Sequence, residues 1–360
     1  MTALLERAPA PPVTRPARRV TTALFVVALG LAAYTGFRLP GAWAVTLQTA
    51  SLADGFHRRF LIGTLLHPFA AIAGYHYWLF AAAAFLILAA LLTVITVAFL
   101  RSRTESARFV LIGWLLVPSG GYLFHEVGYY DQAIYLLLFA ALFALHRNRP
   151  VVASGLMVLS VLTHEIALLT VLPVFALVLL QKMPFRRVCT LVAPPAVAGL
   201  IVLALPPAAP GAIAKFQQKL ADAQFPFRDD ALRLFARTQV ESWRIYSITD
   251  VLLYLVPILL VVIGGYLILH RDLLSVAAIV APALLAFGGW DEARWGFLLV
   301  CNFAVVLFLR LQNRELRVAQ LGALAAAFLI LTHIPMAYFD GYTPREITLV
   351  GKPHAVGVSG

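Results

Sequence analysis

Apolar stretches alternate with short polar connections along almost the whole chain. About eleven stretches approach membrane-spanning length, and charged residues are nearly absent inside them. Roughly 18 to 25 apolar residues cross a hydrocarbon core of about 30 Å, where only helices satisfy the backbone in a chain of this kind. The pattern therefore predicts an all-α, polytopic transmembrane helical bundle. The predicted spans are Val20–Phe37, Tyr77–Leu100, Phe109–Phe124, Gln132–His146, Val151–Thr163, Ile166–Leu180, Val188–Leu205, Val251–His270, Leu273–Trp290, Trp295–Leu309 and Val318–Tyr338.

Two stretches depart from simple alternation. Phe60 to His76 is apolar, but a full crossing there would place Arg101 to Arg108 outside, so we predict a re-entrant or interfacial helix on the outer face. Val151 to Leu180 is interrupted at Thr163-His164-Glu165. The first half is too short to span about 30 Å at about 1.5 Å per residue. This junction is expected within the membrane, facing protein or a water-filled cavity.

The polar connections sort into two sets of different charge. One set holds sixteen basic and four acidic residues, a net of +12, whereas the remaining connections have a net of −1. Short basic loops stay in the cytoplasm, so the first set and the N-terminus are predicted to be cytoplasmic. Eleven crossings then place the C-terminus outside. The basic set is Arg7, Arg15, Arg18, Arg19, Arg101, Arg103, Arg108, Arg147, Arg149, Lys182, Arg186, Arg187, Arg271, Arg310, Arg314 and Arg317.

Composition agrees with a membrane protein. Of 360 residues, 61% are hydrophobic and 12% charged, which excludes an ordinary soluble protein. The net charge of +11 reflects cytoplasmic loops that meet anionic lipid, so no nucleic-acid partner is predicted. We expect a disordered cytoplasmic tail over 1–19, a single transmembrane domain over 20–338 and an extracytoplasmic tail over 339–360.

The longest connection is an outer loop over residues 206–250. Phe216 and Leu220, then Leu232, Phe235 and Ala236, recur at helical spacing with basic residues opposite them. Two amphipathic helices are predicted. They could lie on the outer leaflet or form a lid packed on the helix ends, and the sequence leaves both possibilities open.

Ionisable residues of several kinds gather in the loop after the first span. Asp54 and His57 could deprotonate a hydroxyl, and Arg58 and Arg59 could hold a phosphate, because the planar guanidinium binds two oxygens. The alternative is that both arginines anchor lipid headgroups, with Asp54 as counter-ion.

The next outer turn, from His125 to Asp131, holds two acids and no basic residue. Glu126 and Asp131 could bind a divalent cation, Mg²⁺ or Mn²⁺, through oxygen ligands. The alternative is a solvated acidic turn with Tyr129 and Tyr130 in the interfacial aromatic belt.

Two further positions carry charge near the membrane. The pair His164-Glu165 is costly at membrane depth, which marks a functional site or a satisfied structural pair, each with a partner. Arg294, in an outer turn, could meet a phosphate or form a salt bridge with Asp291 or Glu292.

This layout resembles the GT-C superfamily of integral-membrane glycosyltransferases. In that family the first span opens into an outer loop with an essential acid, a second acid lies in the next outer loop, and polyprenyl-phosphate sugars are donors. Asp54 takes the first position, and Glu126 with Asp131 takes the second. The resemblance covers the first six spans. The chain lacks a large C-terminal soluble domain and an Asp-x-Asp in the second loop, which leaves metal dependence and acceptor class open.

The resemblance implies a sugar transfer in the bacterial inner membrane with the active site on its outer face. Asp54 would act as base on an acceptor hydroxyl, and arginines would stabilise the departing lipid phosphate. The implied partners are membrane lipid, a polyprenyl-phosphate-linked sugar donor and a glycan or lipid acceptor. The candidate catalytic residues are Asp54, His57, Glu126, Asp131, His164 and Glu165, and the candidate substrate-binding residues are Arg58, Arg59, Arg244, Arg294, Tyr129 and Tyr130.

Two other functions compete with this interpretation. An O-antigen polymerase or ligase-like enzyme would centre its chemistry on the arginines of the loop over 206–250, including Arg237 and Arg244, and would not need Asp54. A secondary transporter would need charged residues at the midplane and a repeat relating its halves, and only His164-Glu165 fits.

Overall fold

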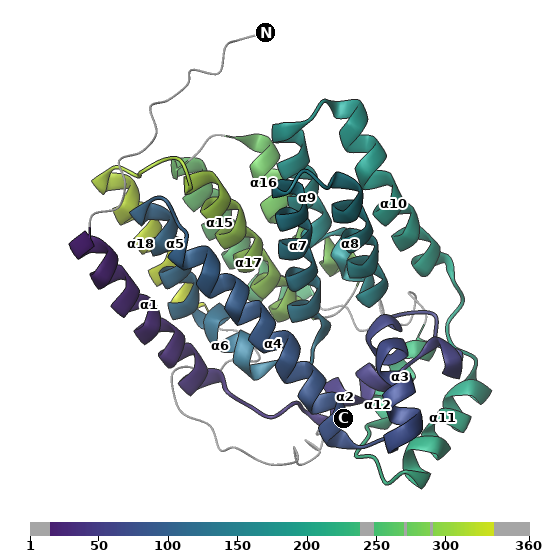
Figure 1. The fold of residues 1–360 in the computed structure, drawn as a ribbon. Coiled ribbons are helices and arrows are strands. Elements are labelled where there is room, and N and C mark those ends of the chain that lie inside the picture. Colours follow the sequence, from purple (N-terminus) through teal and green to yellow (C-terminus); the bar gives the residue numbers. More distant parts are fainter. Residues whose placement is uncertain (1–14, 238–247, 270–271, 289–290, 335–360) are drawn as a thin grey trace.

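The computed structural model describes residues 15–237, 248–269, 272–288 and 291–334, and every regular element in these ranges is a helix. Long helices stand side by side in one bundle, and α2, α3, α11 and α12 gather at one end of it (Figure 1). The protein is therefore a helical membrane bundle.

The bundle contains α1 (Arg15–Gly36), α4 (Tyr77–Leu100), α5 (Glu105–Leu116), α6 (Pro118–His125), α7 (Tyr130–His146), α8 (Pro150–Thr163), η2 (Glu165–Leu168), α9 (Val171–Lys182), α10 (Phe185–Ala204), α14 (Ile248–Asp250), η4 (Val251–Leu255), α15 (Val256–Leu269), α16 (Leu273–Val280), η5 (Ala281–Phe287), α17 (Glu292–Leu311) and α18 (Val318–His333). The end group contains α2 (Ala42–Thr49), η1 (Leu52–Asp54), α3 (Leu61–Ala73), α11 (Pro210–Asp222), α12 (Asp229–Arg233) and η3 (Leu234–Ala236).

The described part of each predicted span coincides with a helix or a helix pair, but helix length does not support eleven crossings. Six helices in the described residues are long and apolar enough to cross a membrane, or seven if the bent pair α5 and α6 is one span. Predicted spans that correspond to α7, α8 and α18 contain helices of 17, 14 and 16 residues. At about 1.5 Å per residue these fall short of a core of about 30 Å.

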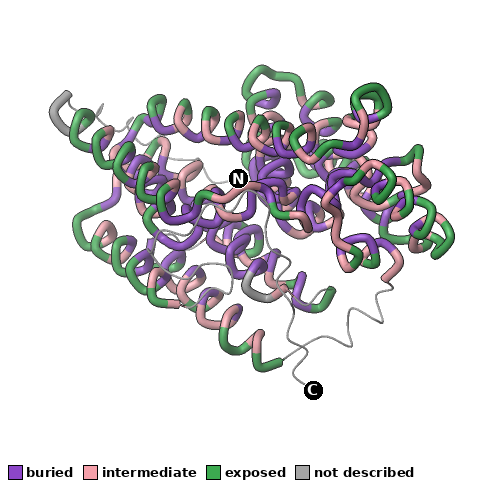
Figure 2. The backbone as a smooth tube through the Cα atoms, turned by 90° about the horizontal axis from the view of Figure 1, so that it is seen from below, coloured by how far each residue is buried: buried purple, intermediate pink, exposed green. Residues whose placement is uncertain are grey.

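The inner faces of the helices form one large hydrophobic core, and the outer faces stay apolar. Helix α4 shows the arrangement: Phe80, Leu88 and Ile95 are among its buried residues, while Leu86 is 70% exposed. Figure 2 shows buried residues along the inner sides of the helices and exposed residues along the outer sides. A helix that is apolar all round fits a lipid surface on one side and a packed core on the other.

The predicted span Phe109–Phe124 is broken in the structure. Helices α5 and α6 meet at an angle of 62°. Pro118 opens α6, and Val117 before it is extended (φ −80°, ψ 167°), because a following proline disfavours the helical conformation. The bent segment packs against α1 at Gly36, where a Cβ would lie 2.0 Å from the Gly121 carbonyl oxygen. Glycine there lets the two backbones approach closely, as is common between membrane helices.

Two other stretches are irregular at the positions that the sequence predicted. Helix α3 has 13 residues, too few to cross about 30 Å, and exposes Phe69 and Ile72. Helix α8 ends at Thr163, His164 is extended (φ −158°, ψ 129°), and η2 begins at Glu165, which confirms the predicted junction.

The described first part of the loop over 206–250, residues 206–237, folds back onto α2, α3 and the start of α4 as a lid. Phe216 of α11 and Phe235 of η3 both pack on Phe56, with ring centroids 5.0 and 4.9 Å apart. Together with residues of α2, α3 and α4 they form a second, smaller hydrophobic core. Because the apolar faces of these helices are buried against protein, the structure favours the lid over helices lying on the leaflet.

The segments predicted at the two ends of the chain lie partly outside the described residues. Helix α1 begins at Arg15, five residues before the predicted span. The C-terminal tail over 339–360 and most of the tail over 1–19 lie outside the described residues.

Candidate functional site

Polar and charged side chains meet where the lid covers the end of the bundle, and they form three neighbouring clusters. The first, the Asp54 cluster, contains Ser51, Asp54, His67, Tyr75 and Lys219. Lys219 Nζ of the lid donates to Asp54 Oδ1 (2.7 Å) and to the Tyr75 hydroxyl (3.0 Å), and Ser51 Oγ donates to Asp54 Oδ2 (2.6 Å). His67 Nδ1 lies 3.2 Å from the Tyr75 hydroxyl and 3.7 Å from Asp54 Oδ2.

These contacts hold the Asp54 carboxylate in position and leave it partly accessible to solvent. Its side chain is 11% exposed and that of Lys219 is 38% exposed. Burial lowers the pKa of Lys219, but its hydrogen bonds to Asp54 and Tyr75 outweigh burial and leave that pKa above the ordinary value. Burial raises the pKa of Tyr75, which stays a neutral hydroxyl. The cluster therefore keeps one carboxylate beside one firmly charged cation.

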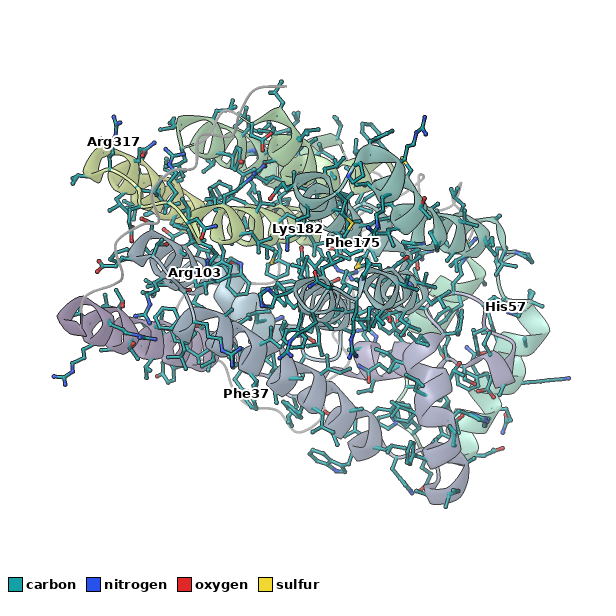
Figure 3. The ribbon with its side chains drawn as sticks, turned by 45° about the horizontal axis from the view of Figure 1, so that its top comes forward. Phe37, His57, Arg103, Phe175, Lys182 and Arg317 are labelled. Atoms are coloured by element: carbon teal, nitrogen blue, oxygen red, sulfur yellow. The ribbon has the colours of Figure 1, made fainter. Side chains whose placement is uncertain are left out.

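The two arginines that follow Asp54 have different partners. Arg58 donates from Nη2 to the carbonyls of Leu205 (3.0 Å) and Leu203 (3.4 Å) at the end of α10, and its Nε is buried without a hydrogen-bond partner. It forms no ion pair with a carboxylate in the described ranges. His57 is exposed at the surface of the end group (Figure 3).

The second cluster, the Arg59 cluster, contains Arg59, Tyr130, His164 and Glu165. Arg59 donates to Glu165 Oε1 from Nη2 (2.7 Å) and Nε (3.0 Å), and His164 Nδ1 lies 3.1 Å from Glu165 Oε2. The His164 ring is 1% exposed, and its Nε2 has no hydrogen-bond partner in the described structure. The charged partner expected for the pair at positions 164 and 165 is therefore Arg59.

Tyr130 ties the second cluster to its neighbours. Its hydroxyl donates to the carbonyls of Leu47 (2.6 Å) and Arg59 (3.2 Å), and its ring packs edge-on against His164. Arg59 has φ 55°, a left-handed conformation that is unfavourable for residues other than glycine. The surrounding contacts thus hold a strained backbone that directs the Arg59 side chain at Glu165.

The third cluster, the Arg294 cluster, contains Tyr122, Glu126, Asp131 and Arg294. Arg294 donates to Asp131 through Nη2 (2.7 Å) and Nε (2.8 Å), the two-point geometry of a strong guanidinium–carboxylate pair. Their side chains are 8% and 4% exposed. Asp291 is farther away, at 3.9 Å, so the main partner of Arg294 is not the nearby acid that the sequence suggested.

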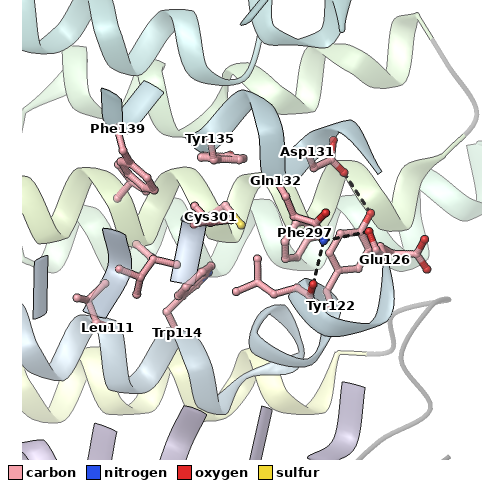
Figure 4. Close-up of a pocket in the computed structure, with 15 residues that line it drawn as sticks. Leu111, Trp114, Tyr122, Glu126, Asp131, Gln132, Tyr135, Phe139, Phe297 and Cys301 are labelled. Atoms are coloured by element: carbon pink, nitrogen blue, oxygen red, sulfur yellow. Dashed lines mark hydrogen bonds between the residues drawn. The ribbon is translucent and has the colours of Figure 1, made fainter. Parts of the chain in front are cut away.

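Other predicted residues surround this pair. The Tyr122 hydroxyl donates to Asp131 (3.3 Å), His125 lies close to Glu126, and the Arg294 guanidinium lies 5.3 Å from the Tyr129 ring. A cavity of about 40 Å³ runs inward from Glu126 and Asp131 toward Leu111 and Phe139 (Figure 4).

Neither acid that the sequence suggested for a divalent cation is free. Both oxygens of Asp131 accept hydrogen bonds from Arg294, so that guanidinium already supplies positive charge there. No group of three or more histidine, cysteine, aspartate or glutamate residues in the described ranges could hold a metal ion.

The structure gathers most of the predicted site residues and adds others. Asp54, Arg58 and Arg59 come from one loop, and the pairs with Glu165 and Lys219 bring α11, η2 and that loop together. Arg244 lies outside the described residues. The sequence did not predict Lys219, Tyr75, His67 or Ser51 as site residues, because nothing local distinguishes them from interfacial polar residues.

Comparison with known proteins adds no assignment. No protein-family model, no curated protein and no solved structure matches this chain.

Proposed function

We propose that this protein transfers a glycosyl group from a polyprenyl-phosphate-linked donor to a glycan or lipid acceptor on the outer face of a bacterial inner membrane. In this proposal the N-terminus lies in the cytoplasm and the lid lies on the outer face of the membrane. The Asp54 cluster under the lid is the place of reaction.

One observation carries the proposal. Asp54 is a partly buried carboxylate, and Arg58, four residues later, is a partly buried guanidinium with no carboxylate partner among the described residues. Arg59 and Arg294 each have a carboxylate partner in contact. A hydroxyl attack with a departing phosphate requires a proton acceptor and a cation that can meet the phosphate, and this loop supplies both in Asp54 and Arg58.

The described contacts give each residue a role. An ionised carboxylate has about four lone-pair sites, so Asp54 can accept the acceptor hydroxyl while it keeps Ser51 and Lys219. Arg58 holds the phosphate of the donor through its unpartnered Nε, while Nη2 keeps the guanidinium tied to the end of α10. The Arg59 and Arg294 ion pairs position this loop and the neighbouring helix ends.

Donor binding by Arg58 is testable by substitution. We expect Arg58→Ala to weaken donor binding by roughly 10-fold or more, because it removes a charge-assisted contact of about 1.5–3 kcal/mol. Arg58→Lys should restore binding only in part, because lysine lacks the two-point geometry. The measurement is the affinity for a polyprenyl-phosphate sugar in detergent. Arg233→Ala, in the exposed face of α12, is the matched control, and equal affinity of the Arg58 and Arg233 variants would contradict this role.

The orientation of the site is testable by labelling in intact cells. Gly211 in the lid and Asn313 between α17 and α18 are both exposed. We expect an impermeant thiol reagent to label a cysteine at Gly211 and not one at Asn313, in a background with Cys189 and Cys301 replaced. The reverse pattern would place the Asp54 cluster in the cytoplasm and end the proposal of an outer-face transferase.

One observation also supports the polymerase or ligase-like alternative. The outer loop contributes Lys219 directly to Asp54, so a loop-centred enzyme would share this cluster. It differs in placing the essential groups on Arg237 or Arg244 and not on Asp54.

A further inference from the structure

A fully buried arginine lies at the opposite end of the bundle from the lid. Arg108, in the first turn of α5, donates from Nη1 to Thr21 Oγ1 (2.7 Å) and to the Arg18 carbonyl (3.2 Å). Its guanidinium carbon lies 4.6 Å from the centre of the Phe99 ring. Its Nε and Nη2 are buried and have no hydrogen-bond partner in the described structure.

This arrangement leaves a charge unbalanced. Arginine stays protonated in proteins, and a buried charge without a counter-ion is strongly unfavourable. Glu105 in the same turn is near enough to act on Arg108, but the two form no ion pair in the described structure, and the neighbouring side chain of Arg18 is also cationic. Nε and Nη2 form the edge of the guanidinium that binds two oxygens of one phosphate or carboxylate. The missing partner is therefore an anion.

An apolar groove is lined by the residue that follows this arginine in α5. It has a volume of about 500 Å³ and lies between α1, α5 and α18, with Leu24, Phe109 and Phe328 among its lining residues. Phe109 follows Arg108 directly, and Leu24 is one helical turn from Thr21. Along α18 the lining runs from Leu321 to Thr332. Eleven residues rise about 16 Å, which is close to half of a hydrocarbon core of about 30 Å, the depth of one leaflet.

We propose that α1, α5 and α18 form a binding site for one anionic phospholipid. Its phosphate accepts hydrogen bonds from Nε and Nη2 of Arg108, and one acyl chain fills the groove. The exposed side chain of Arg18, which donates to the Leu100 carbonyl (2.7 Å), moves aside to admit the phosphate and then contacts it. The lipid would bridge α1 and α18, and it is separate from the sugar donor under the lid.

The test is lipid binding to the intact protein, delipidated in neutral detergent and examined by native mass spectrometry and thermal unfolding. We expect the wild type to retain phosphatidylglycerol more strongly than phosphatidylcholine. Arg108→Gln should weaken this binding by roughly 10-fold or more, because it removes a charged hydrogen-bond donor. Inorganic phosphate should give little protection, because it does not fill the groove.

A pair of tryptophan variants tests the acyl chain separately. Ala325 lines the groove and is exposed, whereas its neighbour Ala326 is also exposed and does not line it. Ala325→Trp should reduce phosphatidylglycerol binding, and Ala326→Trp should not. These two variants therefore test the lipid site even if Arg108→Gln fails to fold. Wild-type lipid binding by Ala325→Trp, or equal protection by inorganic phosphate, would overturn the lipid site.

Discussion

Replacing Asp54 by asparagine is expected to lower glycosyl transfer by about 10²–10⁴-fold, because the change keeps the shape of the side chain and removes its basicity. Donor lipid should still bind, since Arg58 is unchanged. Lys219 loses its ionised partner, but its side chain is 38% exposed and water can solvate it. The measurement is transfer of sugar from a polyprenyl-phosphate donor, with protein yield and melting temperature recorded alongside.

A second carboxylate on the lid provides the control. Asp222 of α11 is exposed and accepts a hydrogen bond from Gln218 (2.7 Å), so Asp222→Asn should leave transfer unchanged. The proposal fails if Asp54→Asn retains near-normal activity. If substitution of Arg237 or Arg244 then eliminates activity, the loop-centred polymerase or ligase-like enzyme is the better description.

The largest effect on stability is expected at Asp131. Asp131→Ala leaves the guanidinium of Arg294 buried without its main counter-ion, and breaking such a pair costs about 3–5 kcal/mol. Replacing both partners with apolar residues, Asp131→Leu with Arg294→Met, should recover much of that loss, because no charge then stays buried. Unfolding of the purified protein in detergent measures both variants.

An exposed ion pair of the lid serves as reference. Arg228 and Asp230 have side chains 26% and 47% exposed, and Asp230→Ala should cost no more than about 1 kcal/mol. If Asp131→Ala unfolds no more easily than Asp230→Ala, the Arg294 cluster does not hold the helix ends together. Recovery of stability without activity in the double variant would separate a positioning role from a purely structural one.

The helices could be predicted from the sequence because their signal is local. The bounds of α4 match the predicted Tyr77–Leu100, since apolar residues fill that stretch and polar residues flank it. The junction at His164 was predictable from charge and length together. The bend at Pro118 was missed although proline is visible in the sequence, because apolar content alone does not reveal a change of direction.

The ion pairs of the site could not be predicted in the same way. Arg294 pairs with Asp131, 163 residues away, and Arg59 pairs with Glu165, 106 residues away, whereas the partners expected from the sequence lie a few positions away. Such pairs depend on how helices pack, and no local periodicity encodes that. Lys219 illustrates the limit, because its spacing from Phe216 and Leu220 predicted only that it lies on a polar face.

The second hydrophobic core has a consequence for how the protein is made. Asp54 and Lys219 are 165 residues apart in the chain, and the rings packed on Phe56 come from the same late segment as Lys219. During synthesis, α2, α3 and Phe56 are therefore made before the lid residues that cover the Phe56 ring. Contacts of such long separation form slowly, and transiently exposed apolar surface is prone to misassembly. A chain stopped before the lid would have no Lys219 beside its Asp54.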